Sequence, residues 1–143
     1  MIRIEGDEEA VHRIAIESER TAPRRADFPA VLAAAEQLEA WFDGALQAFD
    51  VALAPPKTPR GQALRDGLRA VGYGTTLTYG GLARQLGSSA RAIGQLCARN
   101  PFPIVVPCHR ILTSAGRDNY SAGDGIVTKR WLLDHETRHG AKP

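Results

Sequence analysis

The chain of 143 residues contains little cysteine and no long apolar run. Two cysteines, Cys97 and Cys108, are too few for the disulfide framework of a small secreted domain. The first residues lack the apolar stretch of a signal peptide, and no segment approaches the roughly 20 apolar residues of a membrane span. The four histidines are scattered and show no zinc-ligand spacing. We therefore expect a protein of the reducing cytoplasm, without a membrane anchor or a bound metal.

Charge is divided unevenly between the two halves of the chain, although the net charge is only +2. Residues 1–55 hold eleven acidic side chains and five arginines, whereas residues 56–143 hold five acids and thirteen Lys or Arg. With 43% hydrophobic residues the chain can bury a real core, as one domain or as two small lobes. The split predicts an acidic scaffold lobe and a basic lobe suited to a polyanion.

The N-terminal part carries the pattern of a small sheet covered by a helix. Ile2–Ile4 and Ile14–Ile16 alternate apolar and polar residues on either side of a Gly6-Asp7 turn, which predicts an antiparallel hairpin. Apolar side chains recur at helical spacing from Pro29 to Leu46, which predicts an amphipathic helix over the hairpin. Residues 49–53 favour a further strand.

A proline-rich segment divides the chain. Residues 55–59 read Pro-Pro-Lys-Thr-Pro, which breaks regular structure and predicts an interlobe linker. We therefore expect a scaffold lobe over residues 1–54 and a second lobe over residues 60–143. Because helical patterns dominate the second lobe, the expected fold class is α+β: a small sheet-plus-helix lobe followed by a mainly helical lobe.

Helical patterns in the second lobe include a predicted helix-turn-helix unit. A first helix is expected over residues 62–71, and a second over residues 79–86 follows Thr78, a good N-cap residue. A turn at residues 87–89 then leads into a helix over residues 90–99. The exposed face of this last helix holds Ala90, Arg91, Ala92, Gly94 and Gln95.

That face is unusual for a reader of the DNA major groove, because few of its side chains are long enough to reach base edges. Small side chains let a helix backbone approach DNA closely, and a lone arginine such as Arg91 can wedge into the base stack. The alternative interpretation is a small-residue face that packs against another helix.

The segment Pro107-Cys108-His109-Arg110 follows an apolar run, Ile104-Val105-Val106, which we expect to be a buried strand. A thiol beside an imidazole at the end of such a strand is a candidate activated nucleophile. For an isolated pair, the alternative is a buried cysteine next to a solvated histidine.

Several short motifs of the second lobe, taken together in chain order, resemble one known family. They are Tyr73-Gly74, Thr78-Tyr79-Gly80, Arg91-Ala92-Ile93-Gly94, Asn100-Pro101, Pro107-Cys108-His109-Arg110, Asn119-Tyr120-Ser121 and the distal Lys129, Leu132-Leu133 and Glu136. This combination is highly specific and resembles the O6-alkylguanine-DNA alkyltransferases, the methylated-DNA–protein-cysteine methyltransferases. The resemblance covers roughly residues 60–136, and the N-terminal lobe matches only in character.

The resemblance implies a single-turnover repair reaction that needs no cofactor. Cys108 would attack the alkyl carbon on guanine O6 and keep the alkyl group. His109 would take the thiol proton through a water molecule, and Glu136 would fix the imidazole tautomer. Tyr79 would donate a hydrogen bond to the flipped base. The residues implied in substrate binding are Tyr120, Ser121, Lys129 and Asn100, the last by tying the helix over 90–99 to the active-site segment.

The implied partner is double-stranded DNA that carries O6-alkylguanine, bound through the minor groove by a monomer. Arg91 would replace the extruded nucleotide in the stack, because an alkyl carbon inside a duplex cannot meet a buried thiol. The other DNA-binding residues would be Ala90, Ala92, Gly94 and Gln95. The chain departs from the family pattern at Arg60-Gly61, Arg65, Gly72 and the longer segment 121–128, so the packing of the first helix and the pocket rim are expected to differ.

Three other functions compete with repair. A non-enzymatic lesion sensor needs no nucleophile, which Cys108 with His109 and Glu136 would supply. A helix-turn-helix transcriptional regulator would need longer side chains on its reading face than the helix over 90–99 offers. A cysteine hydrolase would need an oxyanion hole, and the sequence offers no evident one. Repair by alkyl transfer is therefore the preferred hypothesis.

Overall fold

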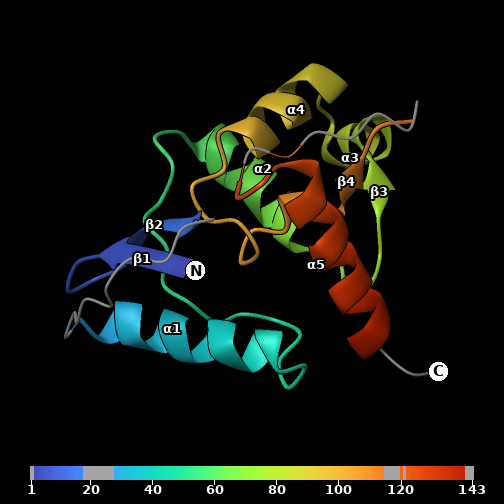
Figure 1. Ribbon diagram of the computed structural model, residues 1–143. Coiled ribbons are helices and arrows are strands. Elements are labelled where there is room, and N and C mark those ends of the chain that lie inside the picture. The colour runs from blue at the N-terminus through green and yellow to red at the C-terminus, as the bar shows by residue number, and fades with distance from the viewer. Residues whose placement is uncertain (1, 18–27, 115–119, 121, 141–143) are drawn as a thin grey trace.

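The computed structural model describes residues 2–17, 28–114, 120 and 122–140. In Figure 1 the N-terminal hairpin and helix α1 lie on the left and below, and the helices of the second lobe fill the centre, top and right. Helices and two small sheets alternate along the chain, so the expected α+β class is confirmed. None of the described helices has both the length and the apolar character needed to cross a membrane.

The predicted hairpin is present. Strands β1 (Ile2–Gly6) and β2 (Val11–Ile16) pair antiparallel, with Ile4 opposite Ile14. The Asp7 carboxylate fixes the turn by accepting hydrogen bonds from the backbone N–H groups of Glu9 and Ala10 at 2.8 and 3.0 Å. Val11 and Ile14 of β2 are both buried although they lie three residues apart, because the register shifts at a bulge opposite Glu5 and Gly6; His12 and Arg13 between them are exposed.

Helix α1 (Pro29–Phe42) packs against the hairpin, as the apolar spacing predicted. The prediction that it continues to Leu46 is wrong. Gly44 adopts a φ of +78°, a left-handed conformation that glycine tolerates and that closes a helix. The buried residues of α1 recur along one face and are Val31, Ala34, Leu38 and Trp41.

Residues 49–53 do not form the predicted strand. Leu53 makes one isolated parallel bridge to Val11. The N–H of Val11 donates to Ala52 O at 2.8 Å, and the carbonyl of Val11 accepts from Ala54 N–H at 2.7 Å. The ladder stops there because the next two residues are prolines, which have no N–H to donate. The segment therefore runs along β2 with only local pairing.

Helix α2 (Pro59–Arg69) starts three residues before the predicted helix over 62–71, inside the predicted linker. Thr58 is its N-cap, and the hydroxyl accepts a hydrogen bond from Gly61 N–H at 3.0 Å. Proline is favourable at the first helical position, where its missing N–H is not needed. Arg65 is buried: its Nη1 donates to Ala54 O at 2.7 Å, and its guanidinium lies 5.0 Å from the centre of the Phe102 ring.

Three short elements follow: β3 (Leu77–Thr78), α3 (Tyr79–Leu86) and α4 (Ala90–Ala98). Thr78 caps α3 as predicted, since its hydroxyl accepts from Gly81 N–H at 2.9 Å. Gly87 ends α3 with a φ of +62°, and Ser89 caps α4 by accepting from Ala92 N–H at 3.1 Å. The two helices pack against each other across the expected turn.

The apolar run before Cys108 is buried, but it is not the predicted strand. Residues 104–106 form turns, with Ile104 at a φ of +75°. The three prolines of this segment lack N–H donors, which prevents a regular ladder. A 3₁₀ turn, η1 (Cys108–Arg110), comes next, and β4 (Ile111–Leu112) pairs with β3 in parallel.

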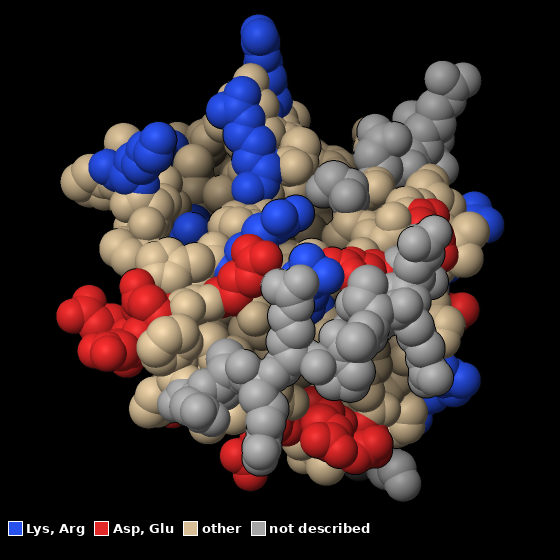
Figure 2. Space-filling view, turned by 60° about the vertical axis from the view of Figure 1, so that its left-hand side comes forward, with Lys and Arg blue, Asp and Glu red and all other residues tan. Residues whose placement is uncertain are grey.

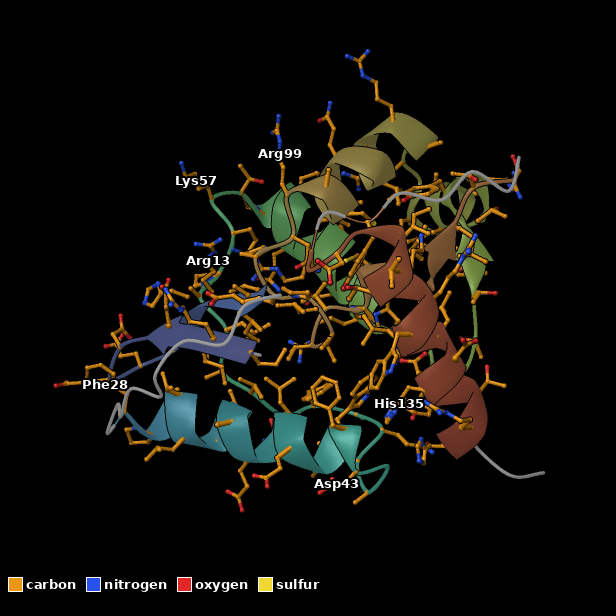
Figure 3. The ribbon with its side chains drawn as sticks, viewed as in Figure 1. Arg13, Phe28, Asp43, Lys57, Arg99 and His135 are labelled. Atoms are coloured by element: carbon orange, nitrogen blue, oxygen red, sulfur yellow. The ribbon has the colours of Figure 1, made fainter. Side chains whose placement is uncertain are left out.

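Helix α5 (Ile126–His139) joins the second lobe to the N-terminal lobe. His135 is buried and its Nε2 lies 2.9 Å from Trp41 O, with the two rings 4.5 Å apart between their centres. Figure 3 shows His135 between α5 and the C-terminal end of α1. Buried residues of both lobes belong to one continuous hydrophobic core.

Acidic and basic side chains occupy different parts of the surface. In Figure 2 the upper part of the visible face carries Lys and Arg side chains and the lower part Asp and Glu side chains, while both kinds occur across the middle and at the right margin. This arrangement follows the uneven distribution of charge along the chain.

Candidate active site

A cavity of about 510 Å³ lies where α3 and α4 meet η1. This volume is in the ordinary range for a small-molecule site and is large enough for a nucleobase. Six residues that the sequence singled out line the cavity, together with two that it did not. The lining residues are Tyr79, Ala90, Arg91, Gly94, Cys97, Ala98, Cys108 and Tyr120.

Cys108 begins the 3₁₀ turn η1 and is only 4% exposed. Asn100 holds its thiol in place, because Nδ2 of Asn100 donates to Sγ at 3.1 Å and to Val106 O at 2.8 Å. The side-chain oxygen Oδ1 of Asn100 in turn accepts from Phe102 N–H at 2.9 Å. Asn100 directly follows the last turn of α4, so it ties that helix to the thiol, as the resemblance implied.

Burial raises the pKa of the Cys108 thiol, which the Asn100 hydrogen bond and the nearby Lys129 ammonium only partly oppose. The thiol is therefore protonated at neutral pH and needs a base before it can act as a nucleophile. Burial also raises the pKa of the Tyr120 hydroxyl, which interacts electrostatically with Cys108. Tyr120 thus remains a neutral hydrogen-bond donor at the cavity wall.

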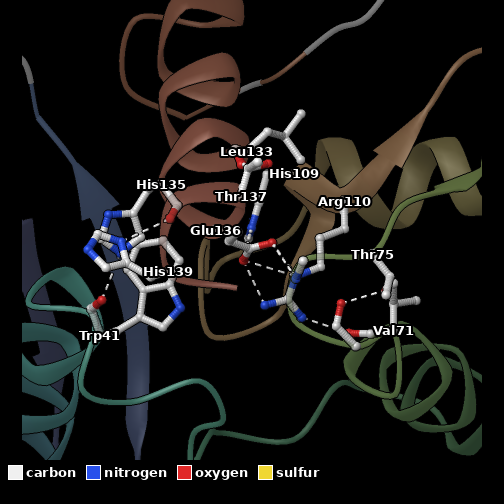
Figure 4. A network of polar contacts seen from close by, with 12 residues as sticks. Trp41, Val71, Thr75, His109, Arg110, Leu133, His135, Glu136, Thr137 and His139 are labelled. Atoms are coloured by element: carbon white, nitrogen blue, oxygen red, sulfur yellow. Dashed lines mark hydrogen bonds and ion pairs between the residues drawn. The ribbon is translucent and has the colours of Figure 1, made fainter. Parts of the chain in front are cut away.

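Behind the cavity lies a buried network of His109, Glu136 and Arg110 (Figure 4). Nε2 of His109 lies 2.8 Å from Oε2 of Glu136. Arg110 binds the same carboxylate, with its Nε 3.0 Å from both oxygens and Nη2 2.7 Å from Oε2. Nη1 of Arg110 also donates to Val71 O at 2.6 Å. All three side chains are buried, so their charges are shielded little by water.

These contacts fix the protonation state of His109. Burial opposes ionisation of Glu136, but hydrogen bonds from His109 and Arg110 outweigh it and lower the pKa of the carboxyl from 4.5 to about 2. A carboxylate can only accept, so Nε2 of His109 carries the proton that faces it. Burial lowers the pKa of His109 below its usual value, although Glu136 opposes this. His109 is consequently neutral, and its Nδ1 keeps a lone pair.

Nδ1 of His109 is buried and has no hydrogen-bond partner within the described part of the chain. A neutral imidazole with one nitrogen held by a carboxylate and the other available is the arrangement of a general base. The arrangement can take a proton from the neighbouring thiol and stabilise the cation that results.

Three of the remaining predicted residues, Lys129, Ala92 and Gln95, do not line the cavity. Lys129 is 1% exposed and its Nζ donates to Ile111 O at 2.7 Å, behind Cys108. Ala92 and Gln95 belong to α4 but do not line the cavity. Ser121 lies outside the described residues. The described residues hold no group of three His, Cys, Asp or Glu side chains that is arranged around a metal position.

Sequence reasoning missed two features of this site. Cys97 is buried in the hydrophobic core, but it also lines the cavity, which the sequence did not lead us to expect, and burial raises its pKa to about 12. The spacing from Ala90 and Gly94 to Cys97 follows one helix face, so helical periodicity was the signal. The role of Arg110 was also missed, because nothing in the sequence pairs it with Glu136, 26 residues away.

The model of the family "6-O-methylguanine DNA methyltransferase, DNA binding domain" matches residues 60–138. Over 106 residues the chain is 42% identical to the methylated-DNA–protein-cysteine methyltransferase of Methanosarcina acetivorans, a match that covers 72% of this chain and 67% of the relative. It is 36% identical to the protein of that name from Methanosarcina mazei over 145 residues, covering 94% and 89% of the two chains.

Among solved structures, the fold resembles that of Mycobacterium tuberculosis OGT in complex with DNA. The TM-score is 0.77 at 32% identity, over 96% of this chain and 87% of that one. Some curated relatives of the same name are covered over only 63% of their own length. Since the family model spans more than half of the chain, and the Methanosarcina mazei relative is matched over most of its length, the chain belongs to the 6-O-methylguanine DNA methyltransferase family.

Proposed function

We propose that the protein is a single-turnover DNA repair transferase that moves the alkyl group of O6-alkylguanine irreversibly onto Sγ of Cys108. One observation carries the proposal. The thiol lies in a cavity large enough for a nucleobase, directly beside a neutral histidine whose tautomer is held by a buried carboxylate. Methylated-DNA–protein-cysteine methyltransferase is also the name of the relatives, and an OGT of the same fold forms a complex with DNA.

The reaction is a direct displacement at carbon. His109 takes the thiol proton through a water molecule, the sulfur forms a bond to the alkyl carbon, and the bond from that carbon to O6 breaks. Guanine leaves with the electron pair, and a hydrogen bond from the Tyr79 hydroxyl to the base makes it a better leaving group. A thioether is itself a poor leaving group, so the alkyl group stays on Cys108 and each molecule reacts once.

The substrate is a guanine flipped out of the duplex. α4 presents its small residues, Ala90 and Gly94, at the cavity mouth, where they allow the helix to enter the minor groove closely. Arg91 is exposed at the same mouth and fills the gap that the extruded nucleotide leaves. Tyr120 and Ser121 close over the base. The protein acts as a monomer and needs no cofactor.

A lesion-binding sensor or a DNA-binding regulator is the alternative. The sensor would flip the base and the regulator would bind DNA, both without covalent chemistry, and neither requires the polar network that holds His109 and Glu136 in the core. Burying three ionisable side chains costs free energy of desolvation, which only well-placed partner groups can offset. The network therefore favours the transferase.

Intact-mass measurement after incubation with a duplex that carries O6-methylguanine distinguishes these functions. We expect one adduct per molecule, a methyl group in place of one hydrogen, confined to the peptide that contains Cys108. A duplex with unmodified guanine is the control and should give no adduct. Binding to the lesion without any mass change would instead identify a sensor.

Replacing Arg91 by alanine should separate base flipping from chemistry. We expect the variant to lose roughly 100-fold in rate on O6-methylguanine in duplex DNA, because flipping costs a few kcal/mol and each tenfold in rate corresponds to about 1.4 kcal/mol. The rate with free O6-benzylguanine, which is already out of a stack, should change much less. Arg130→Ala, an exposed arginine on α5, is the control. Equal losses on both substrates would place Arg91 in chemistry or folding.

The pH dependence of the reaction should report the protonation of His109. A general base works only when neutral, and burial lowers the pKa of this imidazole from its usual 6.5. We therefore expect the rate with free O6-benzylguanine to stay flat as the pH falls from 8 through 6.5, and to decline only at more acidic pH. A decline with its midpoint at or above 6.5 would contradict the proposed role of His109.

A further inference from the structure

Basic side chains from three separate elements lie on one side of the molecule. They are Arg13 of β2, Lys57 just before α2, and Arg99 at the C-terminal end of α4, and Figure 3 shows all three there. Each is exposed to solvent. Within the described ranges, none of them takes part in an ion pair.

Backbone hydrogen bonds hold these three positions together. Ile14 N–H donates to Pro101 O at 2.8 Å, which places β2 against the residues that follow α4. Arg13 precedes Ile14, and Arg99 lies two residues before Pro101. Because Ile14 points into the core, Arg13 points outward on the opposite face of the strand.

The chain before α2 is fixed to the same region. Ala54 N–H donates to Val11 O at 2.7 Å, and Ala54 O accepts from Nη1 of Arg65 at 2.7 Å. Lys57 follows three residues later, before α2 begins at Pro59. The position of Lys57 beside β2 is therefore set by packing that involves both lobes.

This row of charges continues the helix that carries Arg91. α4 rises about 1.5 Å per residue, so the eight residues from Arg91 to Arg99 span roughly 12 Å. That length corresponds to the rise of three or four base pairs along the duplex axis, at about 3.4 Å each. From Arg99 the row passes across Lys57 to Arg13, away from the cavity.

Acidic groups lie mostly elsewhere on the N-terminal lobe. Glu36, Glu39 and Asp43 are on the exposed side of α1, and Figure 3 shows Asp43 at the opposite edge of the molecule from Arg99. The acids nearest to the row belong to the hairpin: Glu5 stands opposite Arg13 in the register, and Asp7, Glu8 and Glu9 lie in its turn. Asp7 is paired with His12, and within the described ranges none of these acids forms an ion pair with the three cations of the row.

We propose that Arg13, Lys57 and Arg99 form a phosphate-binding strip that holds the DNA backbone on one side of the lesion. The strip rests on the proposed function, because its orientation is set by the cavity and Arg91. It gives the N-terminal lobe, which is acidic in total, a direct part in DNA binding. Long basic side chains bind phosphates through charge alone, so this binding is independent of sequence.

The salt dependence of binding to an undamaged duplex, long enough to reach from α4 to β2, tests the strip. Each phosphate contact contributes a slope of roughly −0.9 to log K against log salt concentration. We expect the double variant Arg13→Gln/Lys57→Gln to flatten the slope by up to roughly 1.8, and Arg99→Gln by up to roughly 0.9. The matched control is Arg130→Gln/Arg138→Gln, which removes two exposed arginines of α5 and should leave the slope unchanged.

Two further measurements separate the possible outcomes. Reaction with free O6-benzylguanine, which has no phosphates, shows whether each variant is folded and whether the proposed chemistry exists at all. The charge-preserving variant Arg13→Lys/Lys57→Arg should keep the wild-type slope. Suppose that the wild-type protein reacts with the free base, but that the Arg13→Gln/Lys57→Gln variant has the same salt slope as the control Arg130→Gln/Arg138→Gln. The strip is then wrong and the proposed function stands. If the wild-type protein does not react, the proposed function fails.

Discussion

Replacement of Cys108 by alanine or serine should abolish alkyl transfer and leave binding to undamaged DNA close to wild type. In the proposed reaction Sγ of Cys108 forms the new bond, and because Cys108 is only 4% exposed we expect it to take no part in holding phosphates. A serine hydroxyl is a far weaker nucleophile, because it keeps its proton at neutral pH and His109 can remove it much less easily than a thiol proton. Intact mass after incubation with O6-methylguanine duplex measures transfer, and titration with unmodified duplex measures binding.

The second cysteine provides an internal control for this result. Cys97 lines the same cavity, but burial raises its pKa to about 12, and within the described residues the only imidazole next to a thiol is that of His109. Cys97→Ala should therefore still carry its adduct on Cys108, at a rate that reflects the altered cavity wall. An adduct on Cys97 in the Cys108→Ala variant would show that the assignment of the acceptor is wrong.

The fold was predictable from the sequence wherever local signals were strong. The hairpin, the Thr78 cap and the extents of α3 and α4 follow from alternation, capping residues and glycine turns. The two helices agree with the structure to within one residue, whereas β1 and β2 extend two and three residues further toward the turn than the predicted strands. The misses occur where backbone constraints overrode hydrophobicity. Prolines flank both segments that were wrongly predicted as strands, at 55 and 56 after residues 49–53 and at 103 and 107 around residues 104–106, and Gly44 ended α1 before its apolar pattern ended.

In the site, contacts between residues far apart in the sequence could not be predicted either. Motif resemblance pointed to Cys108, His109 and Glu136, and the structure places Cys108 in the cavity wall and His109 in contact with Glu136. Arg110 could not be assigned from the sequence, because its importance depends on which carboxylate the fold brings to it. Its neighbour Val71 adds a backbone carbonyl that no side-chain pattern encodes. Contacts of this kind depend on the packing of α5 against η1.

Replacing Glu136 by glutamine should have the largest effect on stability of any substitution in the site. The change leaves the Arg110 guanidinium, which is 5% exposed, without a counter-charge, and breaking a buried ion pair on one side costs about 3–5 kcal/mol. Urea unfolding at pH 7 measures this loss. Glu39→Gln, at an exposed position of α1, is the control and should change the free energy of unfolding little.

The same variant should also slow alkyl transfer for a reason that stability does not explain. Nη2 of Arg110 and Nε2 of His109 both contact Oε2 of Glu136, so the new amide keeps its oxygen at that position and still accepts from both groups. A neutral amide, however, stabilises the imidazolium that forms in the proposed proton transfer less well than a carboxylate does. We expect the folded Glu136→Gln protein to react more slowly with free O6-benzylguanine at every pH at which it is folded.

Acid should reduce the difference in stability between the wild-type protein and the Glu136→Gln variant. Because the folded-state pKa of Glu136 is lowered from 4.5 to about 2, its ion pair stabilises the fold fully above pH 4.5. As the pH falls below 4.5 toward 2, the unfolded chain takes up the proton first, and the stabilisation is progressively lost. The gap between the two unfolding free energies should therefore be constant from pH 7 to 5 and smaller at pH 3. A gap of the same size at pH 3 would show that the loss comes from packing and not from the carboxylate charge.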